Sequence, residues 1–288
     1  MQMKVGVILP SLAVQRRDKL TLAEAARHAE DVGLDSVWHG DHLAVGMPTV
    51  DCTIALAVAA TATSRIAIGA SVFIPAIRPL VWAAKQLASL QLVSGGRLLL
   101  GVGSGGGPAQ WAAAGVPFDE RGRRTETALR LFPGLLTGED TTVAGFYPTV
   151  EVPPLWVGNA SEVAIDRAAR LGNGWFPSLI TPARLAAGRS RLNTLASAAG
   201  RPVPAVTIGA SGALGSADGT PTRAELAAGI AGAYQHAARD AADIPITGEP
   251  AEAAERIAEY AADHLVIGLS GPGWRTQIDL LAEVRDLL

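Results

Sequence analysis

Cysteine and lysine are both scarce in this chain of 288 residues. With Cys52 as its single cysteine, the chain cannot form an internal disulfide. Because Cys52 lies in the apolar run 52–63, we interpret it as a buried structural thiol rather than a reactive one. Lysine occurs three times against 21 arginines. Wherever the protein holds an anion, we therefore expect a guanidinium rather than an ammonium.

An excess of basic charge is also missing. The 24 basic and 27 acidic residues give a net charge of -3, which provides neither a basic stripe for a nucleic-acid backbone nor a polybasic patch for anionic lipid. The first apolar run, 5–9, stops at Pro10 and is too short for a signal peptide, and longer uncharged stretches are interrupted by Gly, Pro or Thr. We expect a soluble cytoplasmic protein with no nucleic-acid partner and no membrane contact.

Apolar residues are plentiful, and they are arranged in short runs. At 49% apolar and 18% charged, the composition excludes disorder. Most of the runs are nearly continuous rather than alternating, which is typical of parallel strands buried on both faces. Eight such runs predict strands at 4–10, 36–41, 66–73, 97–103, 154–158, 174–178, 206–211 and 264–269.

Helix signals separate these predicted strands. Thr21 and Glu24 form a capping box, and Thr181 with Pro182 provides an N-cap followed by proline at the first helical position. A helix also starts at Asn159 or Ser161, and the last long helix before the eighth strand starts within 247–250. Eight strand-helix repeats predict an α/β fold, a (β/α)8 TIM barrel, with residues 1–288 as one domain.

Three segments are harder to interpret. Pro133 lies inside a helical pattern that begins near Arg121, so we expect this helix to kink or stop close to Leu131. Segments 138–152 and 212–243 are broken by Gly, Pro and Thr near expected strand ends, where barrel enzymes often carry lids.

In such a barrel the chemistry lies where the strands end, and few acids or bases follow these strands. The second strand ends in His39, Gly40, Asp41 and His42, while the others end in hydroxyls and an amide, at Ser71, Ser104, Asn159, Ser178, Ser211 and Ser270. A metal hydrolase needs ligands from several strands, but His28, His236 and His264 fall in helices or at the start of a strand. A glycosidase needs two opposed carboxylates, and only Asp41 is available. We expect no metal.

The segment 101–107, GVGSGGG, contains the GxGxxG pattern of dinucleotide-binding folds. It follows the fourth strand rather than the first, and Pro108 comes directly after it, so the pattern is a weak signal. One interpretation is a flexible strand-to-helix turn. The other is a run of bare backbone amides that a large flat or phosphorylated ligand can approach. Asn159, Ala160 and Ser161 favour the second interpretation, because a helix N-terminus at the neighbouring strand end attracts phosphate.

With so few acids and bases, the demanding chemistry is expected to come from a bound cofactor. Here the chain resembles the luciferase-like monooxygenase family of flavin- and deazaflavin-dependent barrel oxidoreductases. Six blocks in the same order carry the resemblance: AEDVGLDSVWHGDH (29–42), ATSRIAIGASVF (62–73), RPLVWAAKQLASLQLVSGGRLLLGVGSG (78–105), GVPFDERGRR (115–124), PPLWVGNASEVAIDRAARLGNGWFP (153–177) and TGEPAEAAERIAEYAADHLVI (247–267).

The resemblance implies a barrel that binds the deazaflavin coenzyme F420 or FMN with its ring over the barrel mouth. Asp41 and His42 match an Asp-His pair beside the ring, which makes both of them candidate catalytic residues, His42 as the proton donor or acceptor. Ser71 and Val72 match a bulge that contains a non-proline cis peptide bond in deazaflavin-using members. The implied cofactor-binding residues are Asp41, Ser71, Val72, Gly103, Ser104, Gly105, Val157, Gly158, Asn159, Ala160 and Ser161.

The chain departs from the family's sugar-phosphate dehydrogenases, which carry an acid after the glycine loop and lysines for the sugar phosphate. Here the loop continues as Gly106, Gly107 and Pro108, so a sugar-phosphate substrate is disfavoured. We favour an oxidoreductase that uses reduced F420 for hydride transfer to a small, rather apolar organic molecule. An FMN-dependent monooxygenase and a flavin-binding protein without turnover are the alternatives. The resemblance also implies a homodimer.

Overall fold

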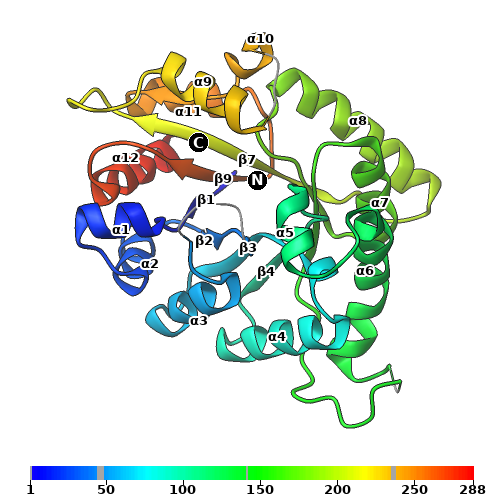
Figure 1. The fold of residues 1–288 in the computed structure, drawn as a ribbon. Coiled ribbons are helices and arrows are strands. Elements are labelled where there is room, and N and C mark those ends of the chain that lie inside the picture. The colour runs from blue at the N-terminus through cyan, green and yellow to red at the C-terminus, as the bar shows by residue number, and fades with distance from the viewer. Residues whose placement is uncertain (1, 44–48, 141, 235–237) are drawn as a thin grey trace.

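The computed structural model describes residues 2–43, 49–140, 142–234 and 238–288. Parallel strands form a ring that helices surround (Figure 1). Each strand of the ring pairs in parallel with both neighbours, which places all of their carboxyl ends at one end of the barrel. The ring runs in the order β1 (Lys4–Ile8), β2 (Ser36–His39), β3 (Ala67–Phe73), β4 (Leu98–Val102), β5 (Leu155–Gly158), β6 (Gly174–Phe176), β7 (Ala205–Leu214) and β9 (His264–Leu269).

The ring closes through two contacts. β9 pairs with β1, and the start of β7 pairs with β6, so the predicted (β/α)8 barrel is confirmed. All eight strands lie where the apolar runs predict them. β7 is longer than its predicted range of 206–211, and its C-terminal end pairs with an additional strand, β8 (Ile246–Gly248), which the sequence did not predict.

The helix ends follow the sequence closely. The capping box of Thr21 and Glu24 is present, and Thr181 and Ser161 both cap their helices. The α-helices are α1 (Leu12–Asp18), α2 (Leu22–Asp31), α3 (Cys52–Ala62), α4 (Leu80–Val93), α5 (Pro108–Ala113), α6 (Arg121–Thr137), α7 (Glu162–Leu171), α8 (Pro182–Ala198), α9 (Arg223–Tyr234), α10 (Ala238–Ala241), α11 (Pro250–Ala258) and α12 (Trp274–Leu287). Two 3₁₀ turns, η1 (Pro75–Ile77) and η2 (Phe118–Glu120), precede α4 and α6.

Of the two outcomes predicted for the helix from Arg121, a kink or a stop close to Leu131, the stop is wrong. α6 continues through Pro133 to Thr137. Phe132, Leu135 and Leu136 are all buried on both sides of the proline. Their packing against the core offsets the hydrogen bond that proline cannot donate, which a local reading of the sequence does not include.

The interior of the barrel is filled by large side chains opposite glycines. Trp38 is fully buried and packs edge-on against Phe176, with ring centroids 5.3 Å apart. A β-carbon on Gly69 would lie 2.1 Å from the Trp38 ring, so this strand position accommodates the indole only as glycine. The barrel interior is therefore a packed core rather than a pore.

Cys52 is buried, as expected, and burial raises the pKa of its thiol well above the usual range. Within the described ranges no helix is long and apolar enough to cross a bilayer. In the same ranges no group of three or more His, Cys, Asp and Glu side chains is placed to hold a metal ion. His236 lies outside the described residues.

Candidate functional site

The C-terminal end of β2 carries both predicted catalytic residues, and they have different surroundings. The Asp41 side chain is 3% exposed, and its carboxylate accepts hydrogen bonds from the guanidinium of Arg78 at 2.6 and 3.0 Å. Its Oδ2 also accepts the backbone N–H of Ile74 at 2.8 Å. Asp41 therefore joins the end of β2 to the segment after β3, and its catalytic and cofactor-binding roles remain predictions.

His42, in contrast, has an exposed side chain. A β-carbon on Gly40 would lie 3.1 Å from Nε2 of His42, so the absence of a side chain at Gly40 leaves room for the imidazole against the backbone. The neighbouring His39 is buried, donates from Nδ1 to the carbonyl of Gly40 at 2.8 Å, and has a pKa lowered by burial. Of these two imidazoles, only that of His42 is accessible at the mouth.

The end of β3 has the predicted peptide geometry. The bond between Ser71 and Val72 is cis, as predicted. The hydroxyl of Ser71 is buried and has no hydrogen-bond partner among the described residues. The side chain of Val72 occupies space that glycines leave free, because a β-carbon would lie 2.2 Å from it at Gly103 and 2.9 Å from it at Gly158. These two glycines are therefore explained by packing against Val72.

The later glycines of the same loop have open surroundings. Nothing lies within 4 Å of a β-carbon placed on Gly106 or Gly107. Gly107 has a φ of 71°, in the left-handed region that favours glycine, and it precedes the first residue of α5. The loop is thus a packing feature in its first half and exposed backbone in its second half, and its contact with a ligand stays a prediction.

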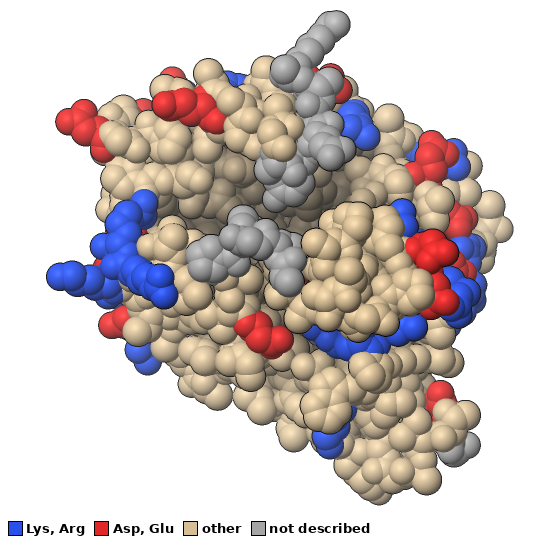
Figure 2. Space-filling model, in the orientation of Figure 1, with Lys and Arg blue, Asp and Glu red and all other residues tan. Residues whose placement is uncertain are grey.

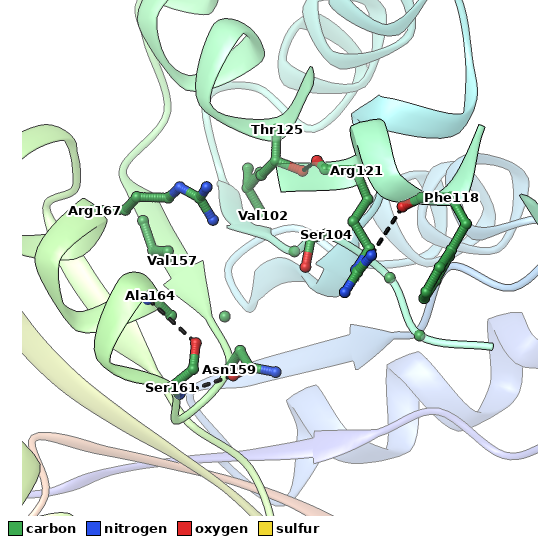
Figure 3. Close-up of a pocket in the computed structure, with 14 residues that line it drawn as sticks. Val102, Ser104, Phe118, Arg121, Thr125, Val157, Asn159, Ser161, Ala164 and Arg167 are labelled. Atoms are coloured by element: carbon green, nitrogen blue, oxygen red, sulfur yellow. Dashed lines mark hydrogen bonds between the residues drawn. The ribbon is translucent and has the colours of Figure 1, made fainter. Parts of the chain in front are cut away.

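The N-terminus of α7 forms the opposite wall. Asn159 has a φ of 89°, in the left-handed region, and its Oδ1 accepts the backbone N–H of Ser161 at 2.8 Å. The Oγ of Ser161 accepts the N–H of Ala164, which identifies Ser161 as the N-cap. These contacts leave the amide nitrogen of Asn159 directed away from the helix, toward the glycine loop (Figure 3).

A cavity of about 350 Å³ lies between these two walls, at the C-terminal ends of β4 and β5 (Figure 3). It brings together seven of the predicted cofactor-binding residues: Gly103, Ser104, Gly105, Val157, Gly158, Asn159 and Ser161. Asp41, His42, Ser71, Val72 and Ala160 are not part of its lining. Figure 2 shows that the molecule is hollowed near the centre of the face in view.

Sequence reasoning missed two arginines in this cavity. Arg121 at the start of α6 and Arg167 on α7 both line it, and in Figure 3 they lie on opposite sides of Ser104. The guanidinium of Arg121 stacks 3.9 Å from the ring centroid of Phe118 and donates to the Phe118 carbonyl at 2.9 Å. The excess of arginine over lysine indicated guanidinium groups at an anion site, but not which ones.

The cavity is therefore suited to an anion. It combines two guanidinium groups, the hydroxyl of Ser104, exposed loop backbone and the positive end of α7. A model of the luciferase-like monooxygenase family matches residues 3–264 of this chain. The chain belongs to this family.

Individual relatives are consistent with the match. The chain is 33% identical to an F420-dependent glucose-6-phosphate dehydrogenase of Amycolatopsis mediterranei over 54% of this chain and 52% of that protein. It spans about half the length of the curated relatives it matches.

Two solved structures share the fold over nearly the whole chain. An F420-dependent secondary alcohol dehydrogenase, in complex with an F420-acetone adduct, superimposes with a TM-score of 0.80 at 18% identity, covering 99% of this chain and 98% of that one. The oxygenating constituent of 3,6-diketocamphane monooxygenase from Pseudomonas putida, in complex with FMN, gives 0.76 at 16% identity, covering 98% and 97%.

Proposed function

We propose that this protein is an oxidoreductase that binds coenzyme F420 at the C-terminal end of its barrel and transfers hydride between it and a small organic substrate. The observation that carries the proposal is the arginine-containing cavity at the ends of β4 and β5, at the same end of the barrel as the exposed imidazole of His42. One site would hold the anionic tail, and the other would face the reacting atoms.

The described residues fit such a coenzyme. Its phosphate would lie in the cavity, against Ser104, Ser161 and Arg121, where charged and polar donors converge. The ring would lie over the mouth beside the end of β3, where the buried Ser71 hydroxyl offers an unused hydrogen-bonding group. Val72 would support the ring from below, because it already fills the space between the two glycines of β4 and β5.

Bound reduced coenzyme supplies a hydride. Within the chain, His42 is the residue we assign to proton transfer: its imidazole gives a proton to the substrate heteroatom as the neighbouring carbon is reduced, and takes it back in the reverse direction. The Asp41–Arg78 pair fixes the backbone from which His42 extends. Exposure of His42 to solvent lets it exchange its proton between turnovers.

The substrate is proposed to be small, uncharged and rather apolar. A sugar phosphate needs cationic groups of its own, yet none of the lysines is at the strand ends. Lys4 begins β1 at the opposite end, Lys19 follows α1, and Lys85 lies on α4, where it donates to the Tyr147 carbonyl. Gly106, Gly107 and Pro108 provide no acid after the loop. We therefore do not propose glucose 6-phosphate, the substrate named for the dehydrogenase relative, as the substrate of this protein.

FMN is the second candidate, because an FMN enzyme shares the fold over nearly the whole chain, and such a protein would use reduced FMN and oxygen. F420 is preferred because curated relatives at 33–35% identity are F420-dependent dehydrogenases. A flavin-binding protein without turnover is the third candidate.

Separate titrations with F420 and with FMN test the proposal. We expect saturable binding of F420, followed by absorbance in the visible range, with FMN binding at least tenfold more weakly. Tighter binding of FMN would reverse the order of the first two candidates. Binding of neither would contradict the proposed function.

We also propose that residues 1–288 form one domain and that the protein is cytoplasmic. We further propose a homodimer formed through α3 and α4. α3 and α4 lie side by side on the outside of the barrel (Figure 1). α4 contains a single charged residue, and several of its apolar side chains are exposed, together with those on α3 and the segment after α6: Ile54, Val81, Trp82, Leu92, Val93 and Tyr147. Sedimentation of the wild type and of Trp82→Glu tests this; a monomeric wild type would exclude it.

A further inference from the structure

The wall of the cavity formed by α6 and α7 contains a charge network whose centre is Glu126. Oε2 of Glu126 accepts from Nε of Arg167 at 3.3 Å, while Oε1 accepts from Arg130 at 2.8 Å and from Arg170 at 3.4 Å. Of the three arginines, only Arg167 lines the cavity. The other two lie on the outer side of the network and are more exposed than Arg167.

Arg167 is held from two directions. Besides the bond to Glu126, its Nη2 donates to the carbonyl of Gly122 at 3.0 Å. A β-carbon on Gly122 would lie 3.2 Å from the same nitrogen, so glycine at this position lets the guanidinium approach the backbone of α6. With Nε and Nη2 engaged, Nη1 is the nitrogen left for a ligand, and Figure 3 shows the guanidinium directed from α7 toward Ser104.

Charge at the network favours an anion in the cavity. Arg130, Arg167 and Arg170 carry three positive charges against the two negative charges of Glu126 and Asp166, so the network has one positive charge in excess. The arginines lower the pKa of Glu126 to about 2, so its carboxylate stays ionised near pH 7. Arg121 adds a second positive charge at the same cavity. A bound phosphate group carries a negative charge of comparable size.

We propose that Arg167 binds the phosphate of the coenzyme through its free nitrogen, and that Glu126 is a positioning residue that orients it. This inference rests on the proposed function for the identity of the ligand. Removing Glu126 has two opposite consequences: the guanidinium loses its orientation, and the cavity becomes more positive. Because the guanidinium is largely buried and forked, orientation decides how many hydrogen bonds it gives to phosphate, so we expect loss of orientation to dominate.

The test measures how much the phosphate group contributes to binding. For each variant, the dissociation constant of riboflavin is divided by that of FMN, and the same ratio is taken for the deazaflavin riboside and F420. General damage to the barrel weakens both members of a pair and leaves the ratio unchanged. A defect in phosphate binding lowers the ratio.

In Arg167→Ala we expect the ratio to fall about tenfold, the scale of one lost charge-assisted hydrogen bond. Glu126→Gln should lower it about threefold with wild-type riboflavin affinity. The matched control is Arg170→Ala, which removes an arginine from the same carboxylate but not from the cavity. The Arg170 side chain is 36% exposed, so solvent screens its charge from the cavity, and the ratio should stay within twofold. An unchanged ratio in Arg167→Ala would overturn the binding role. A ratio in Glu126→Gln equal to or above the wild-type value would overturn the positioning role.

Inorganic phosphate separates this inference from the proposed function. Its stabilisation of the protein against heat should be present in the wild type and in Arg170→Ala, and lost in Arg167→Ala. Such a pattern without any binding of F420 or FMN would support Arg167 as an anion-binding residue while contradicting the proposed function. No stabilisation by phosphate, together with flavin binding that is independent of Arg167, would support the proposed function and overturn the phosphate-binding role of Arg167.

Discussion

Two groups of polar side chains, one at each end of the barrel, have different surroundings. At the N-terminal end, Nε1 of Trp38 donates to Oγ of Ser36 at 2.7 Å, and Oγ of Ser36 lies 2.8 Å from Nε2 of His264. These three side chains are buried and satisfy one another. At the C-terminal end, the Ser71 hydroxyl has no partner among the described residues, and His42 faces solvent.

The difference lies in which side chains have their hydrogen bonds satisfied within the protein. The network of Trp38, Ser36 and His264 is satisfied within the barrel. The Ser71 hydroxyl and the His42 imidazole lie where a ligand at the C-terminal end could use them. Within the C-terminal end the same distinction recurs on adjacent residues. Asp41 is bound to Arg78, while His42 is accessible. We therefore expect changes at Asp41 to act through the fold and changes at His42 to act through the chemistry.

The largest expected effect is the loss of the Arg78 partner. Arg78→Ala leaves the carboxylate of Asp41 buried without its counter-ion, which should destabilise the protein by about 3–5 kcal/mol. The measurement is the free energy of unfolding in urea. Arg123→Ala is the control, because its pair with Glu120 is at the surface, and it should change that free energy by less than about 1 kcal/mol. Equal changes in unfolding free energy in the two variants would contradict the structural role of the Asp41–Arg78 pair.

The next effect concerns pH and the N-terminal network. Burial lowers the pKa of His264 from 6.5 to about 4. Between these values the unfolded chain binds a proton that the folded protein does not, so stability is full above about pH 6.5 and falls as pH decreases toward 4, by roughly 3 kcal/mol. Unfolding free energies at a series of pH values would show this slope in the wild type and a flatter one in His264→Asn. The same slope in both would assign the effect to other groups.

The third effect is on turnover. His42→Ala should keep coenzyme affinity within about tenfold, 1.4 kcal/mol, while turnover falls by about 100-fold, the usual scale for a lost general acid or base. Steady-state kinetics with an identified substrate, together with a coenzyme titration, separates the two quantities. An imidazole that only packs beside the ring would leave the rate unchanged.

The smallest effect lies at the N-terminus of α7. Ser161→Asp places a carboxylate where the phosphate is proposed to bind, and should weaken coenzyme affinity about tenfold by repulsion. Folding should be intact or slightly more stable, because aspartate is as good an N-cap as serine. A thermal melt and a coenzyme titration on the same variant check both statements. Unchanged affinity would place the phosphate elsewhere.

Most of the fold could be predicted from the sequence because the barrel strands are nearly continuous apolar runs with clear ends. β8 escaped prediction because three residues, Ile246 to Gly248, are too few to form a pattern and their pairing with β7 is not local. The predicted stop at Pro133 was wrong because the rule that proline ends a helix considers only the local sequence. Burial of neighbouring side chains on the same helix outweighs it.

The candidate site was less predictable wherever side chains come from helices. The glycine loop and Ser161 follow strands directly, so their position at the barrel mouth could be inferred from the fold. Arg121 and Arg167 lie on helices, where the sequence gives no sign of which arginines face a cavity. Likewise, Arg78 is 37 residues from Asp41, and no sequence pattern near either residue predicts their ion pair.

The most direct test of the account is a crystal structure of the protein with F420 bound. We predict its phosphate in the cavity between the glycine loop and α7, within hydrogen-bond distance of Ser104 or Ser161, and its ring beside His42. A phosphate bound outside this cavity, or a ring away from the mouth, would contradict the assignment of the C-terminal end as the coenzyme site.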